Sequence, residues 1–299
     1  MNKDDLPKIH GVYRFNAELK NWFDVPAKAE ILFRPADIED LQNFLKWRAE
    51  KSEKFPLTIL GAASNVIIKD QIKGVVIKLG GEFAKVFCEG ETIRAGAAAL
   101  CGNVALYSKN SELENLEFLT GIPGSIGGAI AMNAGCYGFD ISQILISVKA
   151  LDFAGNLIEL SNSDCKFTYR KNAAAENLIF VEALFKGVAS NSEIVSEKIL
   201  QLNQQREKAQ PIRAKTGGST FKNPHPTDST AKKAWQLIDE AGCRAMICGD
   251  AQISEKHCNF MINTGQASAQ DLIDLGNKVQ KLVKEKSNVN LEWEIKILG

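Results

Sequence analysis

The chain has 299 residues, of which 45% are hydrophobic and 24% are charged, a composition that excludes disordered, collagen-like and coiled-coil proteins. Lysine plus arginine total 36 and aspartate plus glutamate also total 36, so the formal net charge is zero. Without a block of like charges, the sequence gives no sign of binding to nucleic acid or to an anionic membrane. An anionic ligand would have to be held by local groups.

The cysteines and the N-terminal segment favour a cytoplasmic protein. The seven cysteines form no C-x-x-C pair, and an odd number spread along the chain is typical neither of a disulfide framework nor of a zinc site. Residues 1–5 contain no apolar signal segment, and no run approaches the ~18–20 apolar residues of a membrane span. We expect reduced thiols, no metal site, no membrane insertion and a cytoplasmic location.

The N-terminal part of the chain combines helices with short strands. Residues 36–49 place apolar side chains at helical spacing behind Asp37, a candidate N-cap. A second helical pattern covers residues 97–108. Between the two helices, β-rich runs predict strands over 57–60, 66–68 and 75–77.

Residues 119–138 break this pattern. Six glycines lie within the segment, too many for the interior of a regular helix, because each glycine costs about 1 kcal/mol there relative to alanine. Such a segment is suited to close approach between the backbone and a ligand. Beyond it, the sequence predicts a hairpin over 148–153 and 157–160, and a further strand over 178–185.

A polar stretch at residues 187–192 indicates a domain boundary, and helices are predicted beyond it. Ser190 and Glu193 form a capping-box pattern for the first of these helices. Gly242 marks the end of the second helix, and Ser268 with Asp271 opens the third.

The C-terminal residues alternate between apolar and polar. This pattern predicts a strand over 289–298 with one buried face, and it places Glu292 and Glu294 together on the polar face.

Several common motifs cannot be placed in the sequence. No G-x-G-x-x-G and no G-x-x-x-x-G-K-[ST] occurs, so Rossmann and P-loop folds lose their main support. Residues 217–221 lack the closing glycine of the hydrolase motif G-x-S-x-G, and Ser219 is therefore not predicted to be a nucleophile.

Two glycine-containing loops remain as candidate anion sites. Residues 61–65 follow a predicted strand, and residues 121–129 contain a Pro-Gly step, which favours a type II turn. Small residues let backbone N–H groups converge on an anion such as a pyrophosphate. The first loop alone is more typical of an ordinary turn, whereas the denser second loop favours binding.

Eight segments together resemble one family in their order and approximate spacing. The chain is similar to UDP-N-acetylenolpyruvoylglucosamine reductases over almost its whole length. The segments that carry the resemblance are 61–65, 121–128, 132–138, 169–170, 218–224, 234–238, 254–260 and 291–295.

The resemblance implies an α+β fold: a two-part FAD-binding domain of the vanillyl-alcohol-oxidase (PCMH) type and a C-terminal α+β substrate domain. The FAD-binding domain would cover residues 1–188, with subdomains at about 1–78 and 79–188. Residues 189–299 would bind the substrate, and the last strand would carry a catalytic glutamate. The short stretch between Arg170 and Ser219 is similar to that of the compact form of the family.

The resemblance also implies a reaction and its cofactors. NADPH would supply a hydride through noncovalently bound FAD to UDP-N-acetylglucosamine enolpyruvate, giving UDP-N-acetylmuramate for peptidoglycan synthesis. We expect a monomer. The residues that would bind FAD are Gly61, Ala62, Ala63, Ser64, Asn65, Gly121, Ile122, Pro123, Gly124, Ser125, Gly127, Gly128 and Ala129.

Three residues would carry the catalysis by resemblance. Arg170 suits a carboxylate because its guanidinium stays protonated and can bind in a bidentate manner. Ser219 would donate a proton to the carbon intermediate, although the residues alone favour a turn serine. Glu294 would hold the developing charge as a protonated acid, a role for which Glu292 is the rival. Tyr169, Arg206, Lys222 and Asn223 would bind the substrate, although Arg206 could equally be an exposed helix residue.

The chain departs from the family pattern at two places. Residues 24–27 replace a usual Gly-Gly pair, and Ala63 replaces a glycine, so Ala63 needs either a negative φ or about 1 kcal/mol of strain. Two other functions stay open: a different FAD-dependent oxidoreductase of the same fold, or a noncatalytic flavin-binding protein. The presence of all three catalytic candidates argues against both.

Overall fold

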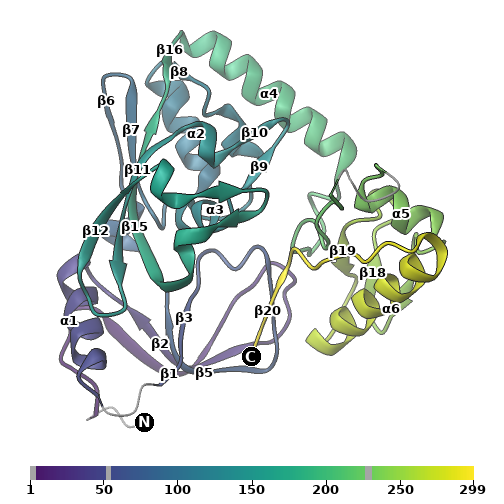
Figure 1. Ribbon diagram of the computed structural model, residues 1–299, viewed down its shortest axis with the longest axis horizontal. Helices are drawn as coiled ribbons and strands as arrows, with labels where there is room; N and C mark the ends of the chain where they lie inside the picture. Colours follow the sequence, from purple (N-terminus) through teal and green to yellow (C-terminus); the bar gives the residue numbers. More distant parts are fainter. Residues whose placement is uncertain (1–4, 52–54, 226–230) are drawn as a thin grey trace. The chain divides into compact units, whose positions relative to one another are not determined.

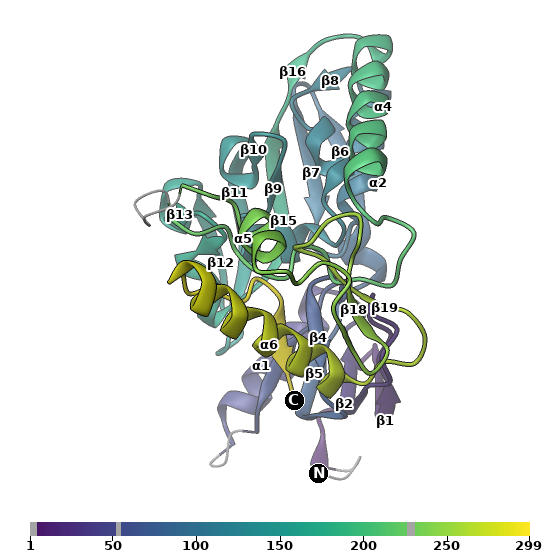
Figure 2. The same ribbon diagram turned by 90° about the vertical axis from the view of Figure 1, so that its right-hand side faces the viewer.

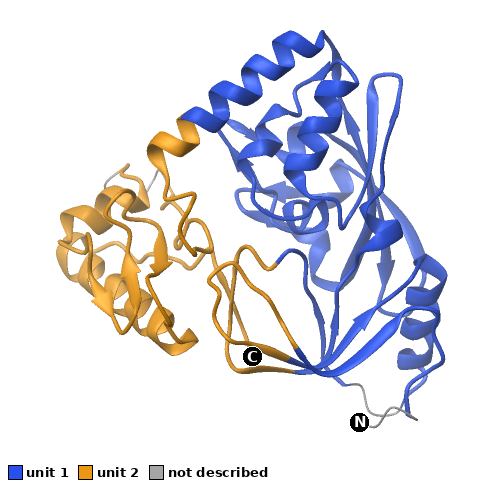
Figure 3. Cartoon of the chain, turned by 180° about the vertical axis from the view of Figure 1, so that it is seen from behind, with its two compact units in different colours: residues 1–17, 29–62, 73–204 blue, residues 18–28, 63–72, 205–299 orange. Residues whose placement is uncertain are grey.

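The computed structural model describes residues 5–51, 55–225 and 231–299. The chain forms two compact units, coloured separately in Figure 3. Unit 1 contains residues 1–17, 29–62 and 73–204, and unit 2 contains residues 18–28, 63–72 and 205–299. Two N-terminal segments therefore belong to the same unit as the C-terminal third of the chain.

The first sheet of unit 1 is covered on one face by α1 (Ile38–Ala49). As predicted, the Asp37 side chain caps this helix, and it accepts a hydrogen bond from the Asp40 N–H at 2.8 Å. Aromatic side chains dominate the core beneath α1, where Phe33 and Phe44 lie 4.6 Å apart. The strand order is β1 (Val12–Glu18), β2 (Lys28–Arg34), β5 (Gln71–Ile77) and β3 (Leu57–Ile59).

A five-stranded antiparallel sheet forms the rest of unit 1, and it contains the predicted hairpin. Its core includes side chains of α2 (Cys101–Asn110), α3 (Ile126–Ala131) and the long α4 (Ser192–Ala209). Figure 2 labels α2 and α4. The strand order is β12 (Leu157–Ser161), β11 (Leu145–Asp152), β15 (Leu178–Lys186), β7 (Thr92–Gly96) and β6 (Val86–Glu89).

Short pairs of strands and 3₁₀ turns complete unit 1. The paired strands are β8 (Leu113–Glu114) with β16 (Val188–Ala189), β9 (Gly135–Cys136) with β10 (Phe139–Asp140), and β13 (Phe167–Thr168) with β14 (Lys171–Asn172). The 3₁₀ turns are Gly81–Ala84, Glu117–Gly121, Ile141–Gln143, Ser163–Cys165 and Ala173–Asn177.

Unit 2 packs two helices, α5 (Ala234–Glu240) and α6 (Ala269–Ser287), around its own core. Its three-stranded sheet has the order β17 (Ile247–Cys248), β18 (Ala251–Ile253) and β19 (Met261–Asn263). A parallel pair joins β4 (Val66–Ile68) to β20 (Lys296–Leu298). Figure 1 labels α5, α6, β18, β19 and β20 of unit 2.

Beyond residue 189, the structure confirms two of the three predicted helix-end signals. Ser268 and Asp271 form a reciprocal capping box, and Gly242, with φ +74°, follows the C-cap of α5. The Ser190 capping box is wrong. The Ser190 N–H donates to the Glu112 carbonyl, and Asn191 caps α4 by accepting from the Ile194 N–H at 2.8 Å.

Two further expectations about local structure need correction. The glycine-rich segment contains a short helix after all, because α3 includes Gly127 and Gly128. The C-terminal strand is shorter than predicted and begins at Lys296. Its alternation fails because Glu294 is buried while Ile297 is 37% exposed.

The described residues also bear on the membrane, thiol and metal expectations. No helix among them is long and apolar enough to cross a membrane. All seven cysteines are unpaired. Within the same described ranges, no group of three or more potential metal-binding side chains comes together.

One buried carboxylate, that of Asp40, attaches the N-terminal segment to α1. Its Oδ1 accepts from the His10 N–H at 2.9 Å. Its Oδ2 accepts from the N–H groups of Gly11 at 2.9 Å and Ala36 at 3.0 Å. The carboxylate therefore satisfies three backbone donors that would otherwise be orphaned beside the core.

We predict that Asp40→Asn lowers the free energy of unfolding by about 3 kcal/mol, because the amide NH₂ would face backbone donors and leave them unsatisfied. Glu39→Gln, an exposed change in the same helical turn, should stay within about 0.5 kcal/mol of wild type. Urea unfolding of both variants measures the difference. Equal stability of the two variants would show that Asp40 does not stabilise the fold.

Candidate active site

Gly61 of the first candidate loop and Ser125 of the second lie close together in unit 1, although they are far apart in the sequence. A Cβ added to Gly61 would lie 2.6 Å from Ser125 Oγ, so a side chain here would displace the Ser125 hydroxyl. A Cβ added to Gly128 would meet only Ser125 Oγ, at 3.6 Å. The exposed face of α3 at Gly128 is thus open, as a site for a flat or extended cofactor requires.

Part of the second loop serves the protein's own packing. The N–H groups of Ile126 and Gly127 donate to the carbonyls of Ala99 and Ala97 at 2.9 and 2.8 Å. A Cβ at Gly127 would lie 3.0 Å from the Ala97 Cβ. Gly127 is therefore required for packing against residue 97, and these two N–H groups do not point toward an anion.

Of the two conformations considered for Ala63, the structure shows the strained one, with a positive φ. Its φ is +54°, a left-handed conformation that costs an L-residue about 1 kcal/mol. The residue is buried, and its carbonyl accepts from the Trp22 N–H at 3.1 Å. This contact and the surrounding packing hold the backbone in the conformation that glycine would adopt without strain.

At the other departure from the family pattern, residues 24–27, side chains hold the backbone in place. Asn21 Nδ2 donates to the Val25 carbonyl at 2.7 Å, and Asp24 pairs with Lys215 at 2.7 Å. The lysine keeps the pKa of the exposed Asp24 carboxyl below its ordinary value. The side chains of Asn21 and Lys215 thus hold the backbone around residues 24–27, which lack the Gly-Gly pair.

Arg170 lies at the tip of the β13–β14 hairpin in unit 1. It has φ +55°, and its guanidinium lies over the Tyr169 ring at 5.2 Å. Two asparagines attach the hairpin near α3: Asn133 Nδ2 donates to the Thr168 carbonyl and Asn172 Nδ2 donates to the Ile130 carbonyl, both at 3.2 Å. The structure therefore places the hairpin that carries Arg170 beside α3, the helix that contains the end of the second loop.

Ser219 lies in unit 2 on an extended segment that Asn259 holds. The Asn259 side chain makes two hydrogen bonds to the Phe221 backbone, donating at 2.8 Å and accepting at 3.0 Å. The Asn259 carbonyl accepts from the Thr220 N–H at 2.7 Å. Ser219 itself is partly buried, and it forms an isolated β-bridge with Phe260.

Glu294 lies on the other side of the same segment. Its N–H donates to the Thr220 carbonyl at 2.8 Å, and its own carbonyl accepts from Asn65 Nδ2 at 3.0 Å. The side chain is buried, with 9% exposure. Glu294 therefore lies on the segment that neighbours the one carrying Ser219 and Thr220.

Glu292 does not share this environment, contrary to the predicted common polar face. It is exposed, and its carboxylate pairs with Lys222 at 3.2 Å. The two glutamates differ because the backbone is not a regular strand here: only Trp293 forms a bridge, to Phe221, before β20 begins. Burial thus distinguishes Glu294 from its rival.

The remaining substrate-binding candidates occupy unit 2. Lys222 is the partner of Glu292. Asn223 accepts from the Ala234 N–H at 3.1 Å at the start of α5. Arg206 donates to Gln210 at 3.3 Å near the end of α4. These contacts fix where the three side chains lie, and their roles toward a substrate stay predictions.

Asn259 is the residue whose importance the sequence did not reveal. Asn259 belongs to segment 254–260, which resembles the family. Nothing in the sequence pattern of this segment indicates that the Asn259 side chain is buried and hydrogen-bonded to the Phe221 backbone. His257 lies two residues before Asn259 and packs against an aromatic side chain. Its ring lies against Phe260 at 4.8 Å, and burial lowers its pKa below the ordinary value.

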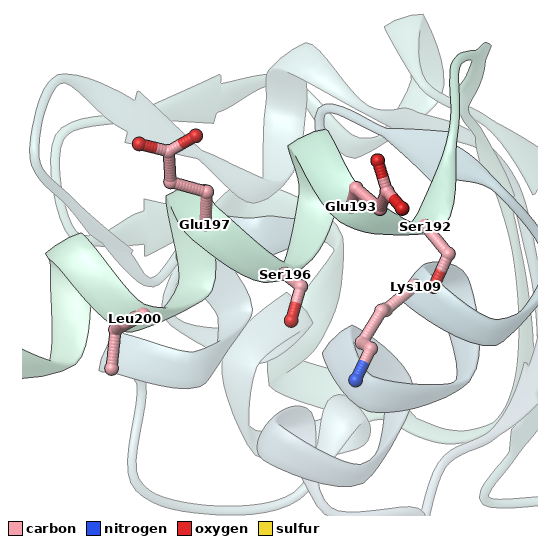
Figure 4. Close-up of a pocket in the computed structure, with 6 residues that line it drawn as sticks. All are labelled: Lys109, Ser192, Glu193, Ser196, Glu197 and Leu200. Atoms are coloured by element: carbon pink, nitrogen blue, oxygen red, sulfur yellow. The ribbon is translucent and has the colours of Figure 1, made fainter.

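A shallow hollow of about 400 Å³ lies elsewhere in unit 1, between α2 and α4 (Figure 4). It contains none of the predicted site residues. Its lining is formed by Lys109, Ser192, Glu193, Ser196, Glu197 and Leu200.

Comparisons with known proteins agree with the two-part arrangement. Residues 29–161 match an FAD binding domain, and residues 210–298 match the C-terminal domain of UDP-N-acetylenolpyruvoylglucosamine reductase. A solved UDP-N-acetylenolpyruvylglucosamine reductase from Thermus caldophilus has a TM-score of 0.81 at 27% identity, covering 98% of this chain and 100% of the other. The predicted fold, an α+β FAD-binding domain of the vanillyl-alcohol-oxidase type with a C-terminal α+β domain, is confirmed.

Curated relatives match over nearly the whole length. The UDP-N-acetylenolpyruvoylglucosamine reductase of Parvibaculum lavamentivorans is 47% identical over 299 residues, covering 99% of this chain and 94% of the relative. That of Anaplasma marginale is 44% identical over 298 residues, covering 99% and 96%. The chain therefore belongs to the UDP-N-acetylenolpyruvoylglucosamine reductase family.

Proposed function

We propose that this protein reduces UDP-N-acetylglucosamine enolpyruvate to UDP-N-acetylmuramate, with FAD as a noncovalent cofactor and NADPH as the hydride donor. The observation that carries the proposal is that the buried Glu294 is hydrogen-bonded to the backbone of Thr220, the residue that follows Ser219. Family membership and the match to an FAD binding domain support it. We place the reaction in peptidoglycan precursor synthesis, and the enzyme in the cytoplasm as a monomer.

The residues of unit 1 fit FAD. Gly61 and Ser125 bring the two loops together, and the missing Cβ of Gly128 leaves the helix open to a cofactor. When bound, FAD accepts a hydride from NADPH and passes it to the terminal carbon of the enolpyruvyl group. The protein's own residues then have to manage the charge that develops on the substrate.

Arg170 is proposed to bind the substrate carboxylate. Hydride addition to the terminal carbon pushes electron density onto the adjacent carbon and into the carboxylate, so a fixed positive charge there stabilises the transition state. A guanidinium suits this role because it stays protonated and can make two parallel hydrogen bonds. The hairpin contacts of Asn133 and Asn172 would hold the arginine in place.

Ser219 is proposed to give its hydroxyl proton to the carbon next to the carboxylate, and solvent later replaces that proton. An alcohol is a weak acid, but a carbanion formed away from water is a strong enough base to remove its proton. Burial of Glu294 favours the neutral acid, since transfer out of water penalises a carboxylate. In that form Glu294 can donate a hydrogen bond to the charge that develops.

We predict that the purified protein is yellow and that heat or acid releases FAD into the supernatant, because the two loops provide noncovalent contacts. Absorbance and fluorescence of the supernatant measure the released flavin. A colourless protein that FAD cannot reconstitute would contradict the proposed function.

We predict that Ser219→Ala leaves flavin reduction by NADPH within a few-fold of wild type but slows flavin reoxidation by the enolpyruvyl substrate by ~10²-fold or more. The proton donor is required only in the second half-reaction, so the loss should be selective. Stopped-flow absorbance follows each half-reaction separately.

Glu294→Gln should show the same asymmetry, whereas Glu292→Gln, the matched change at an exposed carboxylate, should not. A Ser219→Ala enzyme that loses flavin reduction and keeps substrate reduction would refute the assigned roles. A flavoprotein with neither half-reaction in its wild-type form would instead be a noncatalytic flavin-binding protein.

A further inference from the structure

Three strands of the first sheet end together beside the first candidate loop. Strands β3 and β5 are parallel, and the Leu60 N–H extends their pairing by donating to the Ile77 carbonyl at 2.9 Å. Strands β2 and β5 also run in the same direction, because the Lys28 N–H donates to Asp70 at one end and the Lys78 N–H donates to Phe33 at the other. The carboxyl ends of parallel strands are a common location for ligands.

A cation lies at the end of each of two neighbouring strands at this edge: Arg34 is the last residue of β2, and Lys78 follows β5. Phe33 and Ile77 both point into the core beneath α1. Since side chains alternate along an extended chain, the next residues, Arg34 and Lys78, lie on the opposite face of the sheet. Gly61, which opens the first candidate loop, lies two residues after the end of β3, the third strand.

Lys78 is a partly buried cation without an anionic partner. Among the residues that the structure describes, no carboxylate pairs with its ammonium, whereas Lys149, Lys198 and Lys215 each pair with one. Burial lowers the pKa of Lys78 below its ordinary value, and the positive charge of Arg34 lowers it further.

Such an arrangement costs free energy unless an anion occupies the edge. Burying a charge is unfavourable when nothing compensates it, and a neighbouring like charge adds to the cost. A pyrophosphate carries two negative charges, and it would offset both the cost of burying the lysine and its repulsion from Arg34. The first candidate loop, which the family relationship assigns to FAD, starts at the same edge.

We propose that Lys78 binds the pyrophosphate of FAD, with Arg34 as an outer positive charge at the same edge. The proposal rests on the proposed function, since it requires that FAD binds here. It adds a charged side chain to a set of cofactor contacts that otherwise consists of small residues and backbone groups.

The test compares FAD binding to the apoproteins of wild type, Lys78→Gln and Lys73→Gln. Lys73 is an exposed lysine of β5, the strand that Lys78 follows, which makes it a matched control. Fluorescence titration should give a dissociation constant for FAD that rises by about tenfold or more in Lys78→Gln, the usual scale for one charge-assisted hydrogen bond. The salt dependence of FAD binding should weaken in this variant and stay unchanged in Lys73→Gln.

Thermal unfolding provides a second readout, because removal of an uncompensated buried cation should leave the apoprotein at least as stable as wild type. Lys78→Met keeps the aliphatic stem and makes the same test if the glutamine variant does not fold. A dissociation constant for FAD equal to that of wild type in either folded variant would overturn the proposal.

NADPH and the UDP substrate also contain pyrophosphates, so a third measurement separates the three sources. With the variant saturated in FAD, the KM values for NADPH and for the enolpyruvyl substrate should stay at wild-type levels. A raised KM with unchanged FAD affinity would assign Lys78 to another nucleotide and refute the proposal. If the wild-type protein binds no FAD, the proposed function fails first and the subsite fails with it.

Discussion

The main chain of Thr220 is the constraint on which the candidate catalytic geometry depends. Its N–H donates to the Asn259 carbonyl at 2.7 Å, and its carbonyl accepts from the Glu294 N–H at 2.8 Å. The Glu294 carbonyl in turn accepts from Asn65 at 3.0 Å. This ladder sets the register of four segments, which contain residues 65, 220, 259 and 294. Because a one-residue slip turns an extended side chain to the opposite face, register also decides which glutamate is buried.

The ladder gives the Asn259 side chain its importance. Its amide bonds the Phe221 backbone in both directions, and a buried amide whose groups are satisfied fixes one arrangement because every alternative leaves a polar group unpaired. Because Ser219 lies two residues before Phe221, these hydrogen bonds also fix the position of its backbone. A neutral hydroxyl needs such placement, since its efficiency as a proton donor depends on its distance from the carbon that accepts the proton.

Local structure could be predicted from the sequence where one local signal decides it. The spacing of apolar residues predicted α1, and the Ser268 capping box was correct. Local structure could not be predicted where tertiary contacts decide it. The α3 glycines are helical because the neighbouring backbone at Ala97 accepts the Gly127 N–H. The burial of Glu294 could not be deduced from alternation, because an isolated bridge rather than a strand precedes it.

The ladder is tested most directly by the two half-reactions of Asn259→Ala, with Asn263→Ala as the matched control. Asn263 is also buried, but it binds Phe23 and its own following turn. We expect both variants to lose stability, and only Asn259→Ala to slow flavin reoxidation by the enolpyruvyl substrate, by ~10-fold or more, while NADPH still reduces the flavin. A folded Asn259→Ala enzyme with wild-type rates in both half-reactions would contradict the account.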